Sequence, residues 1–139
     1  KREEVLSEVA HTENVRQRLD DRLATPSLWS AFCSHLARRG HGVPDEVLSA
    51  DHFVSTQPNE QLQNVLVEIY RHDVSSAELC ERLVDLDEGL QEWRYRHVKM
   101  VERTIGVKPG TGGSSGVGYL LSTLGQPVFA DLWAIRARL

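Results

Sequence analysis

The chain has 139 residues, of which 40% are hydrophobic and 26% charged, a balance typical of a folded globular domain or a large piece of one. The net charge of −4 comes from interspersed acids and bases, and no apolar run approaches the roughly 18–20 residues that span a bilayer. We therefore expect no nucleic-acid partner, which would need a concentrated basic surface, and no membrane partner.

The two cysteines, Cys33 and Cys80, lie far apart, and each sits within an apolar helical pattern. We predict buried free thiols in a reducing compartment, because two cysteines without a C-x-x-C spacing favour neither a disulfide nor a metal site. The sequence opens with Lys1 rather than a start methionine or a signal peptide, so we expect it to come from the middle of a longer protein.

The first half of the chain predicts three helices and a loop. Residues 5–23 have apolar positions at helical spacing. A second helix should begin with Thr25 as N-cap and Pro26 at the first helical position, and should end at Gly40. Its apolar stripe comprises Leu28, Phe32 and Leu36. Residues 41–59 predict a loop with a helical turn at 46–50, and residues 58–72 a helix with Leu62, Val65, Leu66 and Ile69 facing inward.

A long helix dominates the second half. Ser75 and Glu78 have the spacing of a capping box, and Gly106 follows the last helical position. One continuous apolar face is predicted, made of Leu79, Leu83, Leu86, Leu90, Trp93, His97 and Met100. Residues 108–118 are rich in glycine, and two short helices, 117–124 and one beginning at Pro127, close the chain. No strand alternation is present, so the predicted fold class is all-α.

His97 occupies a position that this pattern reserves for buried side chains. A buried imidazole needs a hydrogen-bond partner or a metal, and taken alone a hydrogen-bonded core histidine is the default interpretation. No histidine pair has zinc-helix spacing, whereas a single axial ligand of a haem needs only one histidine. The nearby bases Arg94, Arg96, Lys99 and Arg103 are expected to be mostly solvated, with one or two able to pair with a ligand carboxylate.

The glycine-rich loop is either a flexible linker or a binding loop. Thr111, Ser114 and Ser115 are interleaved with its glycines, which let a backbone approach a ligand closely. No Gly-Lys-Ser/Thr follows, and Ser115 stands where a dinucleotide fingerprint requires glycine, so phosphate binding is disfavoured.

At this point specific motifs outweigh general patterns. Trp93-Arg94-Tyr95-Arg96-His97, VERTIGVK at 101–108 and GTGGSSGV at 110–117 closely resemble the carboxy-terminal core of tryptophan 2,3-dioxygenases. Segments 24–29, 36–41, 79–85 and 129–133 resemble the same family in the same order. The resemblance implies a helical haem-dioxygenase fold that is homotetrameric and cytoplasmic. It implies haem b (iron) as cofactor, and O₂ insertion into the indole ring of L-tryptophan to give N-formyl-L-kynurenine, in the kynurenine pathway.

The resemblance also assigns roles. His97 matches the family's axial iron ligand, and Thr111, with Gly112 beside it, matches the loop that contacts the substrate's ammonium group. The family's distal histidine, arginine and tyrosine belong to an amino-terminal half that this chain lacks. We therefore expect no catalytic residue here, an inactive fragment, and residues 1–139 to be the carboxy-terminal part of one domain. The segment 70–80 also looks about one helical turn shorter than in the family.

Two alternatives stay open at the level of sequence. The chain could belong to a related haem enzyme that acts on another indole or on a phenol, because the distal residues decide the substrate. It could also be a non-catalytic helical interaction module whose glycine loop is a binding surface. The distal sequence separates the first alternative from the tryptophan enzyme, and haem binding separates the second.

Overall fold

The computed structural model describes residues 13–51, 57–106, 108 and 117–139. Within these ranges the chain is helical and contains no strand, which confirms the all-α prediction. The helices are α2 (Glu13–Ala24), α3 (Leu28–Arg38), α4 (Asp45–Leu48), α5 (Glu60–His72), α6 (Val74–Ile105), α7 (Val117–Ser122) and α8 (Ala130–Ala134), followed by a 3₁₀ turn at Arg136–Arg138. None of the helices described is both long and apolar enough to cross a membrane.

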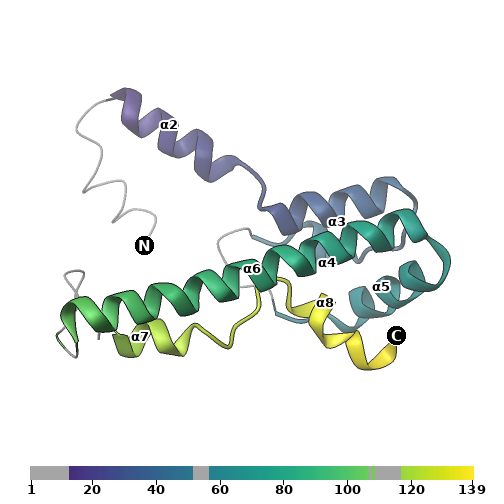
Figure 1. Ribbon diagram of the computed structural model, residues 1–139. Coiled ribbons are helices and arrows are strands. Elements are labelled where there is room, and N and C mark those ends of the chain that lie inside the picture. Colours follow the sequence, from purple (N-terminus) through teal and green to yellow (C-terminus); the bar gives the residue numbers. More distant parts are fainter. Residues whose placement is uncertain (1–12, 52–56, 107, 109–116) are drawn as a thin grey trace.

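Helix α6 is the axis of the molecule (Figure 1). Its 32 residues span about 48 Å at 1.5 Å per residue. Helices α3, α4, α5 and α8 gather around its first half, α7 lies along its second half, and α2 projects away from the rest (Figure 1). The molecule therefore consists of a packed end and an extended end that share one helix.

The hydrophobic core lies at the packed end. Its largest fully buried members come from α3, α5, α8 and the residues that flank α8, namely Leu36, Leu62, Leu66, Ile69, Phe129, Leu132 and Ile135. Cys33 and Cys80 belong to the same core, both fully buried and both free thiols, as predicted. Burial raises the pKa of each thiol to about 12, so neither is ionised near neutral pH.

Helix α3 begins later than predicted. Ser27 is its N-cap and accepts a hydrogen bond from the Ser30 N–H at 3.1 Å. The Thr25 hydroxyl instead donates to the Asp21 carbonyl at 3.0 Å, so Thr25 closes α2 and the prediction that it caps α3 was wrong. Leu28 is the first residue of α3, and its side chain is 53% exposed, so it does not belong to the buried stripe that was predicted.

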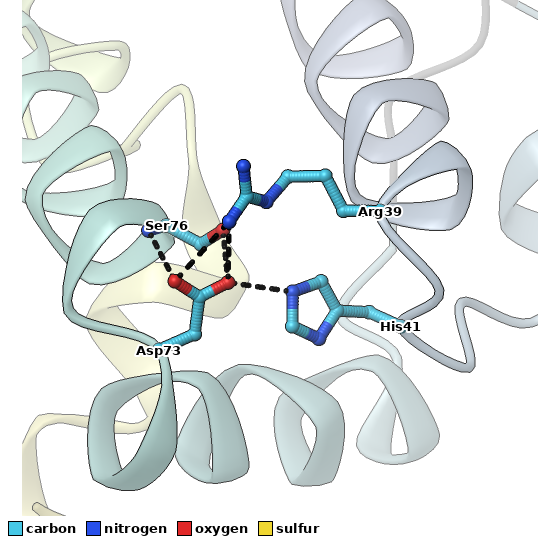
Figure 2. Close-up of polar contacts among 4 residues, drawn as sticks. All are labelled: Arg39, His41, Asp73 and Ser76. Atoms are coloured by element: carbon cyan, nitrogen blue, oxygen red, sulfur yellow. Dashed lines mark hydrogen bonds and ion pairs between the residues drawn. The ribbon is translucent and has the colours of Figure 1, made fainter.

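Asp73 marks the start of α6 and joins three elements (Figure 2). Its carboxylate accepts from the Ser76 N–H at 3.1 Å and the Ser76 hydroxyl at 2.7 Å, and from Arg39 and His41 at 3.2 and 3.1 Å. These bonds, the Ser76 hydroxyl first, hold the pKa of Asp73 well below its usual value. The predicted capping box at Ser75 was wrong, because Asp73 caps the helix two residues earlier.

The single buried face predicted for α6 was also wrong in part. Leu83 is buried, but Leu86, Trp93 and Met100 are 43%, 61% and 56% exposed. The buried residues of α6 are instead Ser76, Cys80, Leu83, Val84, Asp87 and Val98. Periodicity identifies an apolar side of a helix, whereas the neighbouring helices decide which part of that side is covered. The predicted end of the helix at Gly106 is confirmed, and Gly106 has a positive φ of 61°.

The boundaries of α4, α5 and α7 lie within about two residues of the predictions, whereas the start of α8 is shifted further. Helix α4 confirms the predicted turn near residue 46, α5 ends at His72 as predicted, and α7 begins at Val117. Asn59 caps α5 by accepting from the Leu62 N–H at 2.9 Å. Helix α8 begins at Ala130 rather than Pro127, because the intervening backbone bonds to α6 instead of entering the helix.

Candidate functional site

A cavity of about 540 Å³ lies where the two ends of the molecule meet. Its walls come from α3, the second half of α6, α7 and the residues that lead into the first turn of α8. The lining residues are Trp29, Trp93, Arg94, His97, Val98, Tyr119, Leu120, Thr123, Gln126, Pro127, Val128, Ala130 and Asp131. This volume falls within the range of small-molecule and cofactor sites.

His97 projects from α6 into this cavity and is half-buried. Its ring stacks on Trp93 one turn earlier, with centroids 5.3 Å apart and planes inclined by 7°. Among the described residues, no group forms a hydrogen bond with either imidazole nitrogen. The hydrogen-bonded core histidine of the default interpretation therefore finds no partner in this part of the chain. An imidazole held flat by an aromatic ring, with nitrogens available, has the chemistry of a metal ligand.

The wall segment, residues 126–131, faces α6 across the cavity. Asp131 is 3% exposed, and its carboxylate accepts from the Asn59 N–H at 2.8 Å and the Gln63 amide at 2.9 Å. These bonds attach the far end of the wall segment to the start of α5. A carboxylate that is buried and doubly hydrogen-bonded keeps its place, which gives this side of the cavity a defined shape.

Asp87 attaches the middle of the wall segment to α6. It is fully buried, and its Oδ2 accepts from the Val128 N–H, the Phe129 N–H and the Trp133 indole at 2.9, 3.1 and 2.9 Å. Burial alone raises the pKa of this carboxyl, but these three N–H groups, together with the Gln91 side chain, outweigh that effect and hold the pKa below its usual value.

The basic residues around His97 separate into two groups. Only Arg94 lines the cavity, where its Nη1 donates to the Gln126 carbonyl at 2.7 Å. Arg96 and Lys99 form exposed pairs with acidic residues of the same helix, at 2.5 and 2.8 Å, and Arg103 is exposed. The expectation of a mostly solvated basic stretch is therefore confirmed, with Arg94 as the cation that faces the cavity.

The other predicted site residues, Thr111 and Gly112, lie outside the described residues, so their roles stay predictions. Of the other histidines that the structure describes, His41 contacts Asp73, and His72 lies 3.4 Å from Glu68 on the surface. Within the described ranges, no cluster of three or more metal-binding side chains occurs. A haem iron, unlike a zinc ion, needs only one histidine from the protein on its proximal side.

Sequence reasoning missed Asp87 and Asp131 as parts of the site. Asp87 follows Cys80 and Val84 at steps of four and three, so it is a charged residue on a buried helix face. That is the same signal that singled out His97. It was overlooked because acidic residues crowd the first half of this helix, where they are also expected to complement the helix dipole.

The fold and this cavity define an all-helical protein that presents one available histidine from a long helix. A family model described as tryptophan 2,3-dioxygenase matches residues 25–139. The chain is 54% identical over 123 residues to the tryptophan 2,3-dioxygenase of Herpetosiphon aurantiacus, covering 88% of the chain and 47% of that protein. It is 56% identical over 117 residues to the enzyme of Anaeromyxobacter sp. strain K, covering 84% and 44%.

The similarity extends through the whole chain in a third relative. The tryptophan 2,3-dioxygenase of Kineococcus radiotolerans is 44% identical over 142 residues, covering all of this chain and 50% of that protein. The chain belongs to the tryptophan 2,3-dioxygenase family, as its motifs predicted. It spans about half the length of the curated relatives that it matches.

Proposed function

We propose that this chain is the iron-ligand-bearing portion of a haem-dependent tryptophan 2,3-dioxygenase. The reaction adds both atoms of O₂ across the C2–C3 bond of the indole ring of L-tryptophan and yields N-formyl-L-kynurenine. Family membership over residues 25–139 supports the activity. The observation that carries the proposal is His97, an imidazole in a 540 Å³ cavity with no hydrogen-bond partner among the described residues.

The residues of the cavity fit a haem. His97 would hold the iron through a ring nitrogen, and its stacking on Trp93 restricts rotation of the ring, so a rigid helix orients the ligand. Arg94 places a cation in the same cavity, where it could pair with a propionate. When bound, the haem supplies the redox-active iron at which O₂ and the indole react.

Thr111 and Gly112 are proposed to hold the amino-acid end of the substrate. A hydroxyl can accept a hydrogen bond from the ammonium group of tryptophan, and the neighbouring glycines remove the side chains that would obstruct its approach. Residues 1–139 are proposed to form one part of a single domain. The assembly as a cytoplasmic homotetramer is likewise proposed from the resemblance to the family.

Replacing His97 tests the ligand assignment in the complete protein. His97→Ala should reduce the haem-to-protein ratio to near zero, measured from the Soret band after reconstitution with haemin. His72→Ala is the matched control, because His72 is 73% exposed at the end of α5 and should leave haem content unchanged. Haem content at the wild-type level in His97→Ala would rule out His97 as the ligand.

Chemical rescue separates loss of the ligand from loss of the fold. In His97→Gly, added imidazole should restore the Soret band, because a free imidazole can enter the space left by the side chain and coordinate the iron. A variant that stays colourless while its circular dichroism matches the wild type would contradict the assignment. A wild-type protein that binds no haem would overturn the proposed function itself and favour the interaction module.

Replacing Thr111 tests the substrate contact. Thr111→Ala should raise the dissociation constant for L-tryptophan roughly 5- to 150-fold, the equivalent of about 1–3 kcal/mol for a lost buried polar contact. Thr104→Ala is the control, since its hydroxyl donates to the Met100 carbonyl within α6 at 2.8 Å. Equal tryptophan affinities in the two variants would remove Thr111 from the proposed site.

A further inference from the structure

Asp87 lies ten positions before His97 on α6, about 15 Å along the helix axis. Together with Ser76 and Asp131, it is one of three buried polar or charged residues in the part of the chain that the structure describes. Burying a carboxylate is costly unless its charge is compensated by hydrogen bonds. Here three N–H groups of one region bond to Oδ2, from the backbone of Val128 and Phe129 and the indole of Trp133, and the side chain of Gln91 on α6 also stabilises the charged form.

The donors to Asp87 belong to the wall of the His97 cavity. Val128 lines the cavity directly, and Phe129 lies between two lining residues, Val128 and Ala130. The ring of Phe129 packs against Trp29, another lining residue, with centroids 5.6 Å apart. By binding this backbone, the Asp87 carboxylate therefore fixes the position of one wall of the cavity.

A second attachment from the same helix acts on the same segment. Arg94 lies seven residues after Asp87, two turns along α6, and its Nη1 donates to the Gln126 carbonyl at 2.7 Å. The wall segment is thus held at a carbonyl by a cation and at two N–H groups by an anion. Both charged residues are carried by the helix that also carries His97, and a helix of this kind is a stiff spacer.

We propose that Asp87 is a positioning residue for the iron ligand, and that its bonds to Val128, Phe129 and Trp133 form a latch. The latch sets the distance between the wall segment and His97 and thereby shapes the side of the cavity into which His97 projects. Asp87 contacts neither the cavity space nor His97, so it acts through the wall segment. The effect on haem rests on the proposed function, whereas the effect on cavity geometry stands without it.

Asp87→Asn in the complete protein is the main test. The amide keeps the shape of the side chain, and its oxygen can still accept at the Oδ2 position, but it removes the negative charge and places an N–H donor at the buried Oδ1 position, which has no hydrogen-bond partner among the described residues. The haem dissociation rate should rise at least roughly tenfold, and the iron–histidine stretching band of the ferrous protein should shift. In the haem-free protein, the ring resonances of His97 and the indole N–H resonance of Trp93 should move at constant pH.

Asp73→Asn is the matched control. Asp73 is also a hydrogen-bonded carboxylate of α6, but its partners are Ser76, Arg39 and His41, none of which lines the cavity (Figure 2). This variant should lose stability while the haem dissociation rate, the stretching band and the two resonances stay at their wild-type values. If the two variants change these quantities equally, Asp87 is only structural and the latch is wrong.

Trp133→Phe provides a second, milder test in case Asp87→Asn fails to fold. It removes one donor to Asp87 and keeps an aromatic ring, so it should move the same quantities in the same direction by a smaller amount. Wild-type values in Trp133→Phe and Asp87→Asn would overturn the latch and leave the proposed function intact. A wild-type protein that binds no haem would overturn the proposed function, and the haem-free resonances would still decide the latch.

Discussion

The two halves of α6 share one helix but have different surroundings. The first half buries Cys80, Leu83 and Val84 against α5 and α8, and the second half exposes Trp93, Tyr95 and Met100. Both halves have apolar residues at helical spacing. Since the sequence pattern is the same, the difference must come from which helices pack on each half.

The two halves of α6 also have different roles. The packed half is bound into the core and provides stability, because buried apolar area is the main favourable term in folding. The extended half carries His97, with α7 beside it, and borders a cavity rather than a core. A rigid helix that leaves the core thus presents the candidate ligand on a well-supported base.

The largest expected difference between the two halves is the loss of stability when a side chain is truncated in the packed half. Leu83→Ala should lower the free energy of unfolding of the 139-residue chain by about 2–5 kcal/mol, through lost burial and the cavity that remains. Met100→Ala, on the same helix but 56% exposed, should change it by less than about 0.5 kcal/mol. Urea unfolding followed by circular dichroism measures both, and equal losses would show that the two halves are packed alike.

A smaller effect concerns the junction at the start of the packed half. The pKa of Asp73 is lowered in the folded state, so its contribution to stability is present above the unfolded value of about 3.9. It is lost as the pH falls below that value toward the lower folded pKa. Asp73→Asn should therefore be less stable than the wild type at pH 7, and the gap should close with acidification.

Urea midpoints measured from pH 7 to pH 2 test this expectation. Glu68→Gln is a suitable control, because Glu68 is a 58% exposed acid of α5 whose partners lie on its own helix. It should give a curve nearly parallel to that of the wild type. A gap between Asp73→Asn and the wild type that stays constant down to pH 2 would show that the Asp73 carboxylate contributes no pH-dependent stability.

The smallest effect belongs to the surface of the extended half. Glu92 and Arg96 form an i, i+4 ion pair with side chains 62% and 76% exposed. Glu92→Gln should cost about 0.3–0.5 kcal/mol in low salt. The cost should vanish in 1 M NaCl, where the screening length is about 3 Å. Unfolding measured at two salt concentrations checks this, and a cost that persists in salt would show that the pair is shielded from solvent.

Local signals predicted the elements well. Three boundaries were predicted from signals that span only a few residues, such as a glycine, a charged residue or the spacing of apolar residues. They are the end of α6 at Gly106, the end of α5 at His72 and the start of α7 at Val117. The starts of α3, α6 and α8 were placed less well. The start of each of these helices is fixed by a hydrogen bond, such as that of Ser30 to Ser27 or of Val128 to Asp87. Which groups form these hydrogen bonds depends on the geometry of the folded chain.

The candidate site divides in the same way. His97 could be identified from its position in a helical pattern and from the motif around it, because both are properties of neighbouring residues in the chain. Its stacking on Trp93 was also within reach of the sequence, as the two residues lie one turn apart. Asp131 and Trp29 could not be assigned to the cavity, since they line it from other elements, and Asp87 could not be connected with it, since it acts through the wall segment.

By itself, the sequence determined the helical class, the order and approximate extent of the helices, the buried free thiols and, through its motifs, the family. These are set by residues within a turn or two of each other, or by direct similarity. Only the tertiary structure decided which half of α6 is covered, which of four basic residues faces the cavity, and which carboxylates hold the wall segment opposite His97. The reason is physical: burial and hydrogen-bond pairing depend on segments about 40 to 70 residues apart, and only packing brings them together.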